Sequence, residues 1–178
     1  LLRESADRMS DADREATLRR IERATRDGRR LAKKALDLAR ARAGRDLYGR
    51  TDVEEVVDEV ASGLPMLRVK GNLPQTAVPR VDLEAEAFAE VCENLLHNAE
   101  QAGAAEVIIT ANPSAHHLEL RFQDDGSGVP EDVRDTLFEP YVTSRLNEGG
   151  HGVGLAHVRA MVESVGGTIA LASASDAR

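Results

Sequence analysis

A run of glycines near the end of the sequence is typical of a backbone that binds phosphate. Glycine fills positions Gly149, Gly150, Gly152 and Gly154, and an apolar, helix-like segment begins at about Val153. Glycine lacks the Cβ that would hold a ligand away, and the first N–H groups of a helix attract phosphate oxygens. The Gly-x-Gly-x-Gly spacing, with no buried strand before it, disfavours a dinucleotide fold. A plain flexible loop remains the alternative.

Two asparagines have the spacing of a metal and phosphate site. Asn94 and Asn98 lie four residues apart in a segment with helical apolar spacing, so they share one helix face. Asparagine is a poor helix former, so two of them in register indicate a function. A carboxamide oxygen can ligate Mg2+, and its NH2 group can donate to a phosphate. Two exposed amides are the alternative interpretation.

The stretch from Asp124 to Gly128 has the residue types of a pocket for a flat, polar ring. It reads Asp-Asp-Gly-Ser-Gly and follows an expected strand. A carboxylate at the end of a strand can accept a hydrogen bond from an exocyclic amine. Gly126 and Gly128 would let the backbone turn sharply beneath the ring. Alone, the stretch could equally be an ordinary Asp-Gly turn.

Alternating helices and strands must position these three stretches. The periodicity of the sequence predicts helices over 53–61, 83–101, 130–137 and 153–165, with Thr51 and Glu54 as a capping box and Asp82 as the second N-cap. Strands are expected at 66–70, 76–81, 106–111, 117–123 and 168–171, with 106–111 and 117–123 forming a hairpin. The predicted fold class is α+β: a two-layer α/β sandwich in which helices cover one face of a mixed sheet.

The N-terminal part of the chain has a different character. Residues 1–50 carry 15 Lys+Arg against 9 Asp+Glu, whereas residues 51–178 carry 8 against 22. Apolar and small residues from Leu18 to Ala39 recur with a four-three alternation, which predicts a helix seam that needs partners. Basic and acidic residues interleave without aromatic partners, which favours a solvated helix face over nucleic-acid binding. We expect residues 1–46 to be the C-terminal part of a dimerising helical hairpin and 47–178 a separate domain.

The cellular compartment is suggested by composition. The single cysteine, Cys92, excludes an intramolecular disulfide and fits a reducing compartment. No run approaches the roughly 18 apolar residues that a membrane span needs. We expect a cytoplasmic location, with a membrane link only through segments upstream of Leu1.

The motifs together resemble a known family. In order and spacing they are similar to the N, G1, F and G2 boxes of the GHKL nucleotide-binding fold of bacterial sensor histidine kinases, here at Asn94–Asn98, Asp124–Gly128, Leu137–Tyr141 and Gly150–Leu155. The run Leu-Phe-Glu-Pro-Tyr-Val-Thr-Ser-Arg from Leu137 is most similar to nitrogen-regulation-type sensor kinases. The resemblance covers about 51–171 and implies ATP and Mg2+ as cofactors.

The resemblance also implies a role for each matched residue. Asp124 would bind the adenine amino group in a pocket shaped by Gly126 and Gly128. Asn98 would hold Mg2+, and Asn94 would lie on the phosphates as its catalytic neighbour. Residues 141–150 would form a mobile lid anchored by Phe138, with Arg145 either neutralising phosphate charge or solvated. The end of the lid would meet the phosphates through Gly150, His151, Gly152, Gly154 and Leu155.

The expected activity follows from a difference within that fold. Gyrase- and mismatch-repair-type ATPases carry a glutamate one turn before the metal-binding asparagine, as the base that activates water, whereas this chain has Asn94 there. Phosphoryl transfer to a protein side chain is therefore favoured over hydrolysis. No histidine precedes His97, which we interpret as truncation.

By the same resemblance, an ATP-dependent protein histidine kinase would pass the γ-phosphoryl to a histidine absent from this chain. The phosphoryl group would then go to an aspartate of a response regulator receiver domain. The full protein would be a dimeric phosphoprotein. A pseudokinase or scaffold that binds nucleotide without catalysis is the alternative.

Overall fold

The computed structural model describes residues 14–19, 47–74, 78–142 and 152–172, with single positions at 21, 25, 28 and 32. Residues 14–19 are helical, and the rest of the expected hairpin lies outside the described residues apart from those single positions. The division of the chain at residues 46 and 47 therefore stays a prediction. Among the predicted site residues, Arg145, Gly150 and His151 also lie outside the described part.

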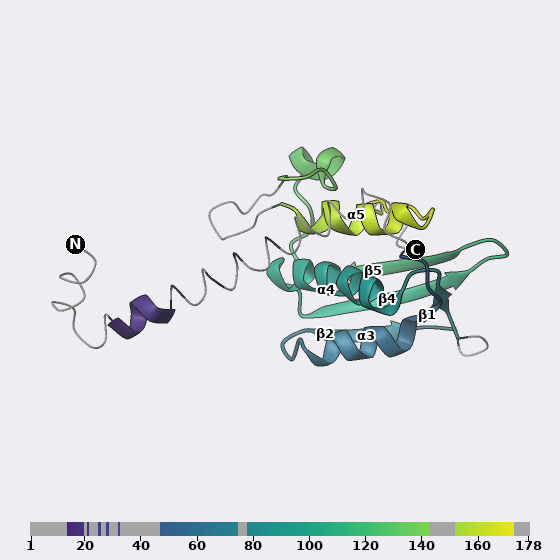
Figure 1. Cartoon of the computed structure of the whole chain (residues 1–178), viewed down its shortest axis with the longest axis horizontal. Helices are drawn as coiled ribbons and strands as arrows, with labels where there is room; N and C mark the ends of the chain where they lie inside the picture. The colour runs from purple at the N-terminus through teal and green to yellow at the C-terminus, as the bar shows by residue number, and fades with distance from the viewer. Residues whose placement is uncertain are drawn as a thin grey trace.

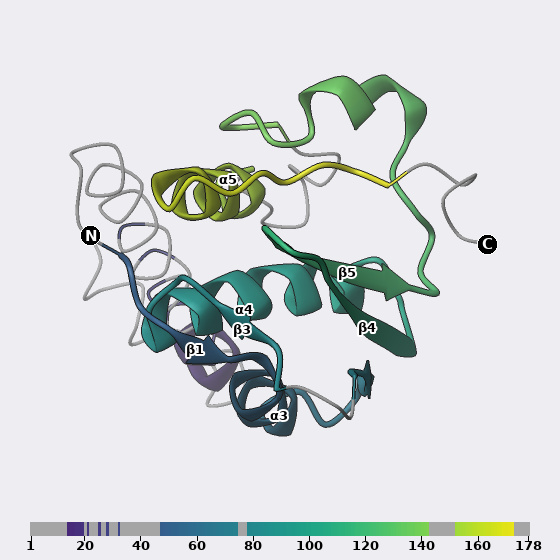
Figure 2. The same cartoon turned by 90° about the vertical axis from the view of Figure 1, so that its right-hand side faces the viewer.

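The described domain consists of a sheet covered by helices on one face. The sheet has the order β2 (Arg68–Asn72), β4 (Glu106–Pro113), β5 (Leu118–Asp124), with β2 parallel and β5 antiparallel to β4. Helices α3 (Val53–Ser62), α4 (Ala85–Gln101) and α5 (Gly154–Ser164) lie together on one side of it (Figure 2). A second, two-stranded sheet pairs β1 (Thr51–Asp52) with β3 (Arg80–Val81). The expected two-layer α+β fold with a mixed sheet is confirmed.

The core lies between the helix layer and the sheet. Helix α4 is central, because it contacts both α3 and α5. Burial raises the pKa of the Cys92 thiol on α4 to about 12, so this cysteine is an inert core residue. The buried apolar side chains of the core are Val53, Val56 and Val57 of α3, Ala87, Phe88, Val91, Cys92, Leu96 and Ala99 of α4, Val107 and Ile109 of β4, Val158 and Met161 of α5, and Leu47, Leu67 and Leu83 from the connecting segments.

The β4–β5 hairpin is formed as expected and is longer than predicted. Its register pairs Val107 with Asp124 and Pro113 with Leu118. Ser114 closes the turn, where its backbone N–H donates to the carbonyl oxygen of His117 at 2.8 Å. This register places Asp124, the last residue of β5, opposite Val107 near the start of β4.

The capping residues of two helices differ from the prediction. Asp52, not Thr51, caps α3, because its Oδ1 accepts from the backbone N–H groups of Glu54 and Glu55 at 3.0 and 3.4 Å. Thr51 is buried, and its hydroxyl donates to the Leu83 carbonyl oxygen at 2.7 Å. Glu84, whose N–H donates to Leu47, precedes α4, and no side chain caps that helix. These tertiary bonds keep Leu83 and Glu84 out of the helix, so the expected cap at Asp82 was wrong.

The predicted strand at 168–171 is absent. Residues 167–172 are described, and no sheet partner is assigned to them. Ile169 packs against the core, whereas Leu171 is exposed. One apolar anchor is too little to fix a strand in register. The expected final strand is therefore missing from the described part of the domain.

Candidate nucleotide-binding site

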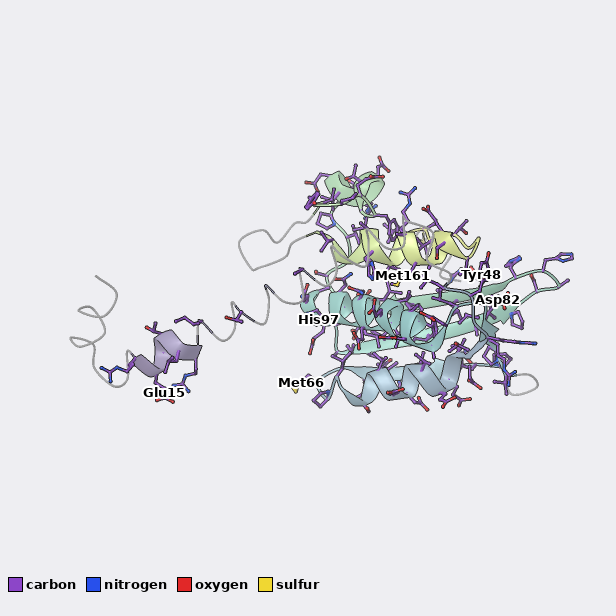
Figure 3. All side chains as sticks on the ribbon, in the orientation of Figure 1. Glu15, Tyr48, Met66, Asp82, His97 and Met161 are labelled. Carbon is purple, nitrogen blue, oxygen red and sulfur yellow. The ribbon has the colours of Figure 1, made fainter. Side chains whose placement is uncertain are left out.

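The separate motifs of the sequence meet at one end of the domain. Helix α4 and the start of α5 approach each other there, and the short 3-10 helix η1 (Glu131–Thr136) lies beyond α5, on the side away from α4 (Figure 1). His97 marks this end of α4 in Figure 3. The turn after β5 reaches the same end, because the Ser127 N–H donates to the carbonyl oxygen of Ala102, just beyond α4, at 3.1 Å. The fold thus gathers residues that are up to about sixty positions apart in the sequence.

The two asparagines of α4 occupy different environments. Asn94 is only 7% exposed, and its Nδ2 donates to the backbone carbonyl oxygen of Glu90 at 2.6 Å. This bond sets the plane of the amide. Asn98 is half-buried, and its side chain has no hydrogen-bond partner among the described residues. The alternative of two exposed surface amides is therefore wrong for Asn94, and Asn98 has an amide available for a ligand.

The turn from Asp124 to Gly128 lies directly on the end of α4. Asp124 is exposed, and its Oδ1 accepts from the Gly126 N–H at 3.0 Å. A Cβ on Gly126 would stand 2.9 Å from the Cβ of Ala102 and 3.0 Å from its carbonyl oxygen, so only glycine fits this contact. Gly128 has a φ of 72°, which also favours glycine. The turn is thereby held against the helix that carries the asparagines.

Asp125 has a structural role that the sequence did not reveal. Its Oδ1 accepts from the backbone N–H groups of Ala105 and Glu106 at 2.8 and 2.9 Å. These bonds hold the pKa of the Asp125 carboxyl below its ordinary value of 3.8, and the bond from the Glu106 N–H has the larger effect. Asp125 therefore fastens the turn to the start of β4, while its neighbour Asp124 faces solvent. The signal available in the sequence was only the doubled aspartate.

We predict that Asp125→Asn makes the stability of the domain less dependent on acid pH. A carboxyl whose pKa is lowered by folding stabilises the fold above its unfolded pKa, and this stabilisation is lost as the pH falls through the folded value. The parent should therefore melt at a higher temperature than the variant at neutral pH, and the difference should shrink as the pH falls from about 4 through the lowered pKa of Asp125. Thermal melting followed by circular dichroism across this range checks it. A difference that stays constant with pH would contradict this role.

The segment before α5 is tied to the end of the predicted lid. The Tyr141 N–H donates to the Gly152 carbonyl oxygen at 2.7 Å, so the chain on either side of residues 142–151 meets at one point. Gly152 has a φ of 62°, and a Cβ there would stand 2.5 Å from the Tyr141 carbonyl carbon and 2.6 Å from the Val142 carbonyl oxygen. We call this contact of Tyr141 with Gly152 the neck. Phe138, the predicted anchor, is half-buried three residues before it.

The start of α5 presents backbone N–H groups without a side-chain cap. Val153 precedes the helix and offers no polar side chain, and Gly154 is its first residue. Gly154 and Leu155 are half-buried. Arg159, one turn further, donates to Glu163 at 2.8 Å and to Glu139 at 3.2 Å, which joins α5 to the segment that contains Phe138. The uncapped N–H groups and the helix dipole suit an anion.

The model of histidine kinase-, DNA gyrase B- and HSP90-like ATPases matches residues 83–178, which include both asparagines, the Asp124 turn and α5. The chain belongs to this ATPase family. The match supports ATP as the nucleotide of this ATPase domain, as the motifs had indicated.

The curated relatives of the ATPase domain include sensor kinases. Sensor histidine kinase ZraS of Escherichia coli strain K12 is 38% identical over 98 residues, which cover 54% of this chain and 21% of ZraS. Nitrogen regulation protein NtrY of Azorhizobium caulinodans is 29% identical over 151 residues, which cover 78% of this chain and 19% of NtrY. The chain thus spans about a fifth of the length of these relatives.

A solved structure agrees with this assignment. The ATP binding domain of PrrB from Mycobacterium tuberculosis superimposes with a TM-score of 0.57 at 26% identity, over 72% of this chain and 89% of that one. The resemblance to sensor histidine kinases read from the motifs is confirmed.

In the part of the chain that the structure describes, no helix is both long and apolar enough to span a bilayer.

The sequence did not predict one buried pair of residues in the ATPase domain. His157 of α5 is 2% exposed, and its Nε2 lies 3.0 Å from Oε2 of Glu90 on α4. The two residues are 67 positions apart. His157 stands between Ala156 and Val158 and reads as one position of an apolar helix, so periodicity gave no signal for it. The pair lies one turn before Asn94 on α4 and one turn after Val153 on α5.

Proposed function

We propose that this chain is the ATP-binding catalytic region of a two-component sensor histidine kinase. The γ-phosphoryl group of ATP would pass to a histidine on a dimeric helical hairpin and then to an aspartate of a response regulator. The observation that carries the proposal is the meeting of the Asn94–Asn98 face, the Asp124 turn and the uncapped start of α5 at one end of a domain of this ATPase family.

Each described residue has a task that its environment supports. The exposed carboxylate of Asp124 accepts from the adenine amino group, and Gly126 and Gly128 give the ring access to the backbone. The first N–H groups of α5, at Gly154 and Leu155, donate to phosphate oxygens. Gly152 and Phe138 support the lid at the neck. Arg145, Gly150 and His151 would complete the contacts from the lid itself.

The side chains of α4 suit Mg2+ rather than a softer metal. Within the described residues no group of three or more His, Cys, Asp and Glu side chains is placed to hold a metal ion. Mg2+ is commonly held by one or two protein oxygens together with substrate phosphates and water, so a half-buried asparagine amide fits it. Asn98 would supply the protein oxygen, and the bound ion would neutralise phosphate charge.

The environment of α4 favours transfer over hydrolysis. Asn94, one turn before Asn98, is a neutral amide and cannot take a proton from water. Glu93 is exposed to solvent, and the carboxylate of Glu90 is engaged with His157. The described part of α4 therefore has no carboxylate placed as a base for water, which leaves a protein side chain as the acceptor of the phosphoryl group.

Titration calorimetry with a non-hydrolysable ATP analogue tests the proposal. We predict that Mg2+ strengthens binding to the parent chain and that Asn98→Ala removes this gain, which we expect to be about tenfold. Asn112→Ala is the matched control, because Asn112 is an exposed asparagine on the distant hairpin that bonds only to Glu119 among the described residues. A parent chain that shows no Mg2+-dependent binding would overturn the proposal.

A second measurement separates a kinase from a scaffold. The full-length protein, incubated with γ-labelled ATP, should retain the label covalently. Nucleotide binding without retained label would favour the scaffold, and rapid multiple-turnover release of phosphate would favour an ATPase.

A further inference from the structure

A buried hydrogen bond between His157 and Glu90 joins α5 to α4. The His157 ring is almost fully enclosed, whereas the Glu90 side chain is 21% exposed, with its Oε2 at 3.0 Å from Nε2. Figure 3 shows Met161, one turn further along α5, on the side of the helix that faces α4. Apolar contacts of this kind allow two helices to slide, whereas a hydrogen bond between fixed atoms sets their offset.

The proton arrangement of the pair can be read from its chemistry. An ionised carboxylate only accepts hydrogen bonds, so Nε2 of His157 carries the proton and donates it to Glu90. Nδ1 of the same ring is buried and has no partner among the described residues. Enclosing a polar ring that is only half satisfied costs free energy that an apolar side chain of similar size would not cost. Stability alone therefore does not account for a histidine here.

Glu90 connects the pair to the site. Its backbone carbonyl oxygen accepts from Nδ2 of Asn94 at 2.6 Å, while its carboxylate accepts from His157. A chain of hydrogen bonds thus runs from α5 through Glu90 to the amide of Asn94. His157 lies one turn after Val153, the residue that precedes α5. Fixing the His157 ring therefore also fixes the uncapped start of that helix.

We propose that His157 and Glu90 are positioning residues for the nucleotide site. Their hydrogen bond fixes the position of α5 along α4. The first N–H groups of α5 and the amide of Asn94 can then bind the phosphates of one nucleotide. The pair touches neither nucleotide nor metal and acts through the two helices that do. This inference rests on the proposed function and adds to it the residues that hold its two phosphate-binding elements in register.

Calorimetry combined with thermal melting tests the positioning role. His157→Leu replaces the ring by an apolar side chain and leaves the Glu90 carboxylate without its partner, so we expect a lower melting temperature than that of the parent. Because the Glu90 side chain is 21% exposed and can be hydrated, the variant should still fold. Its affinity for the ATP analogue with Mg2+ should nevertheless fall about tenfold. Glu90→Gln keeps an oxygen that accepts from Nε2 and should retain most of the affinity. Met161→Leu, a volume-conserving change in the same helix interface, is the matched control and should bind as the parent does.

The outcomes separate the two proposals. A folded His157→Leu variant that binds the analogue like the parent would overturn the positioning role alone. Absence of binding by the parent would overturn the proposed function and this inference with it. If His157→Leu does not fold, Glu90→Met removes the same bond from α4, and parent-like affinity of that folded variant would equally reject the role.

Discussion

Asp124→Asn is expected to lower the affinity of the chain for an ATP analogue by at least about tenfold, since hydrogen bonds to charged groups contribute roughly 1.5 to 3 kcal/mol. The asparagine still offers an oxygen to the Gly126 N–H, so the turn should keep its shape. The carboxylate that would accept from the adenine amino group is replaced by an amide, which also presents an NH2 group. We therefore expect discrimination against a GTP analogue to weaken at the same time. Calorimetry with both analogues measures the two effects.

The neighbouring aspartate provides a matched control. Asp125→Asn changes the net charge by the same amount in the same turn, but the Asp125 carboxylate accepts from the backbone N–H groups of Ala105 and Glu106. It should alter thermal stability and leave the preference for ATP over GTP intact, whereas Asp124→Asn should do the reverse. If both substitutions weakened ATP binding equally, the two carboxylates would not have the separate roles that their contacts indicate.

Gly152→Ala is expected to destabilise the domain by about 3 kcal/mol or more, because it combines backbone strain with overpacking. Gly152 has a left-handed φ of 62°, and an added Cβ would stand 2.5 Å from a backbone atom of Tyr141. Backbone cannot move aside as a flexible side chain can, so the neck must open. Because the neck adjoins the start of α5, we also expect nucleotide affinity to fall. Denaturant unfolding and calorimetry measure the two losses.

A second glycine with a similar backbone conformation serves as the control that separates backbone strain from the steric clash of an added Cβ at Gly152. Gly166 has a φ of 77°, and a Cβ there would meet nothing within 4 Å. Gly166→Ala should therefore cost only the strain of the left-handed backbone, about 1 to 2 kcal/mol, with nucleotide affinity unchanged. Equal losses for the two variants would mean that the neck contact does not contribute.

The sequence predicts regular elements well where its pattern is local. Helix α4 follows the spacing of Ala87, Val91 and Ala99, and the β4–β5 hairpin follows two apolar runs joined by Asn-Pro-Ser. The helix caps were predicted wrongly because tertiary hydrogen bonds decide them. The Thr51 hydroxyl donates to the Leu83 carbonyl oxygen, and Asp52 caps α3 instead. The strand expected at 168–171 has suitable residues, but strand formation depends on a partner that local pattern cannot specify.

In the site too, local sequence motifs could be predicted, whereas contacts between residues far apart in the sequence could not. Motif order located Asn94, Asn98 and Asp124, and the structure brings their elements together. The roles assigned to them stay predictions until ligand binding is measured. The structural use of Asp125 and the pairing of His157 with Glu90 both depend on atoms far apart in sequence, so neither residue type nor spacing could reveal them.

The neck has a consequence for how the lid can vary. The ten residues between Tyr141 and Gly152 begin and end at a fixed hydrogen bond, so this segment is a closed loop whose length is not dictated by the distance it spans. Each doubling of the length of a flexible loop adds only about 0.6 kcal/mol of closure entropy. Insertions there would therefore leave the folded scaffold almost unaffected. If this stretch is the lid that the motifs predict, its residues can diverge independently of the stability of the domain.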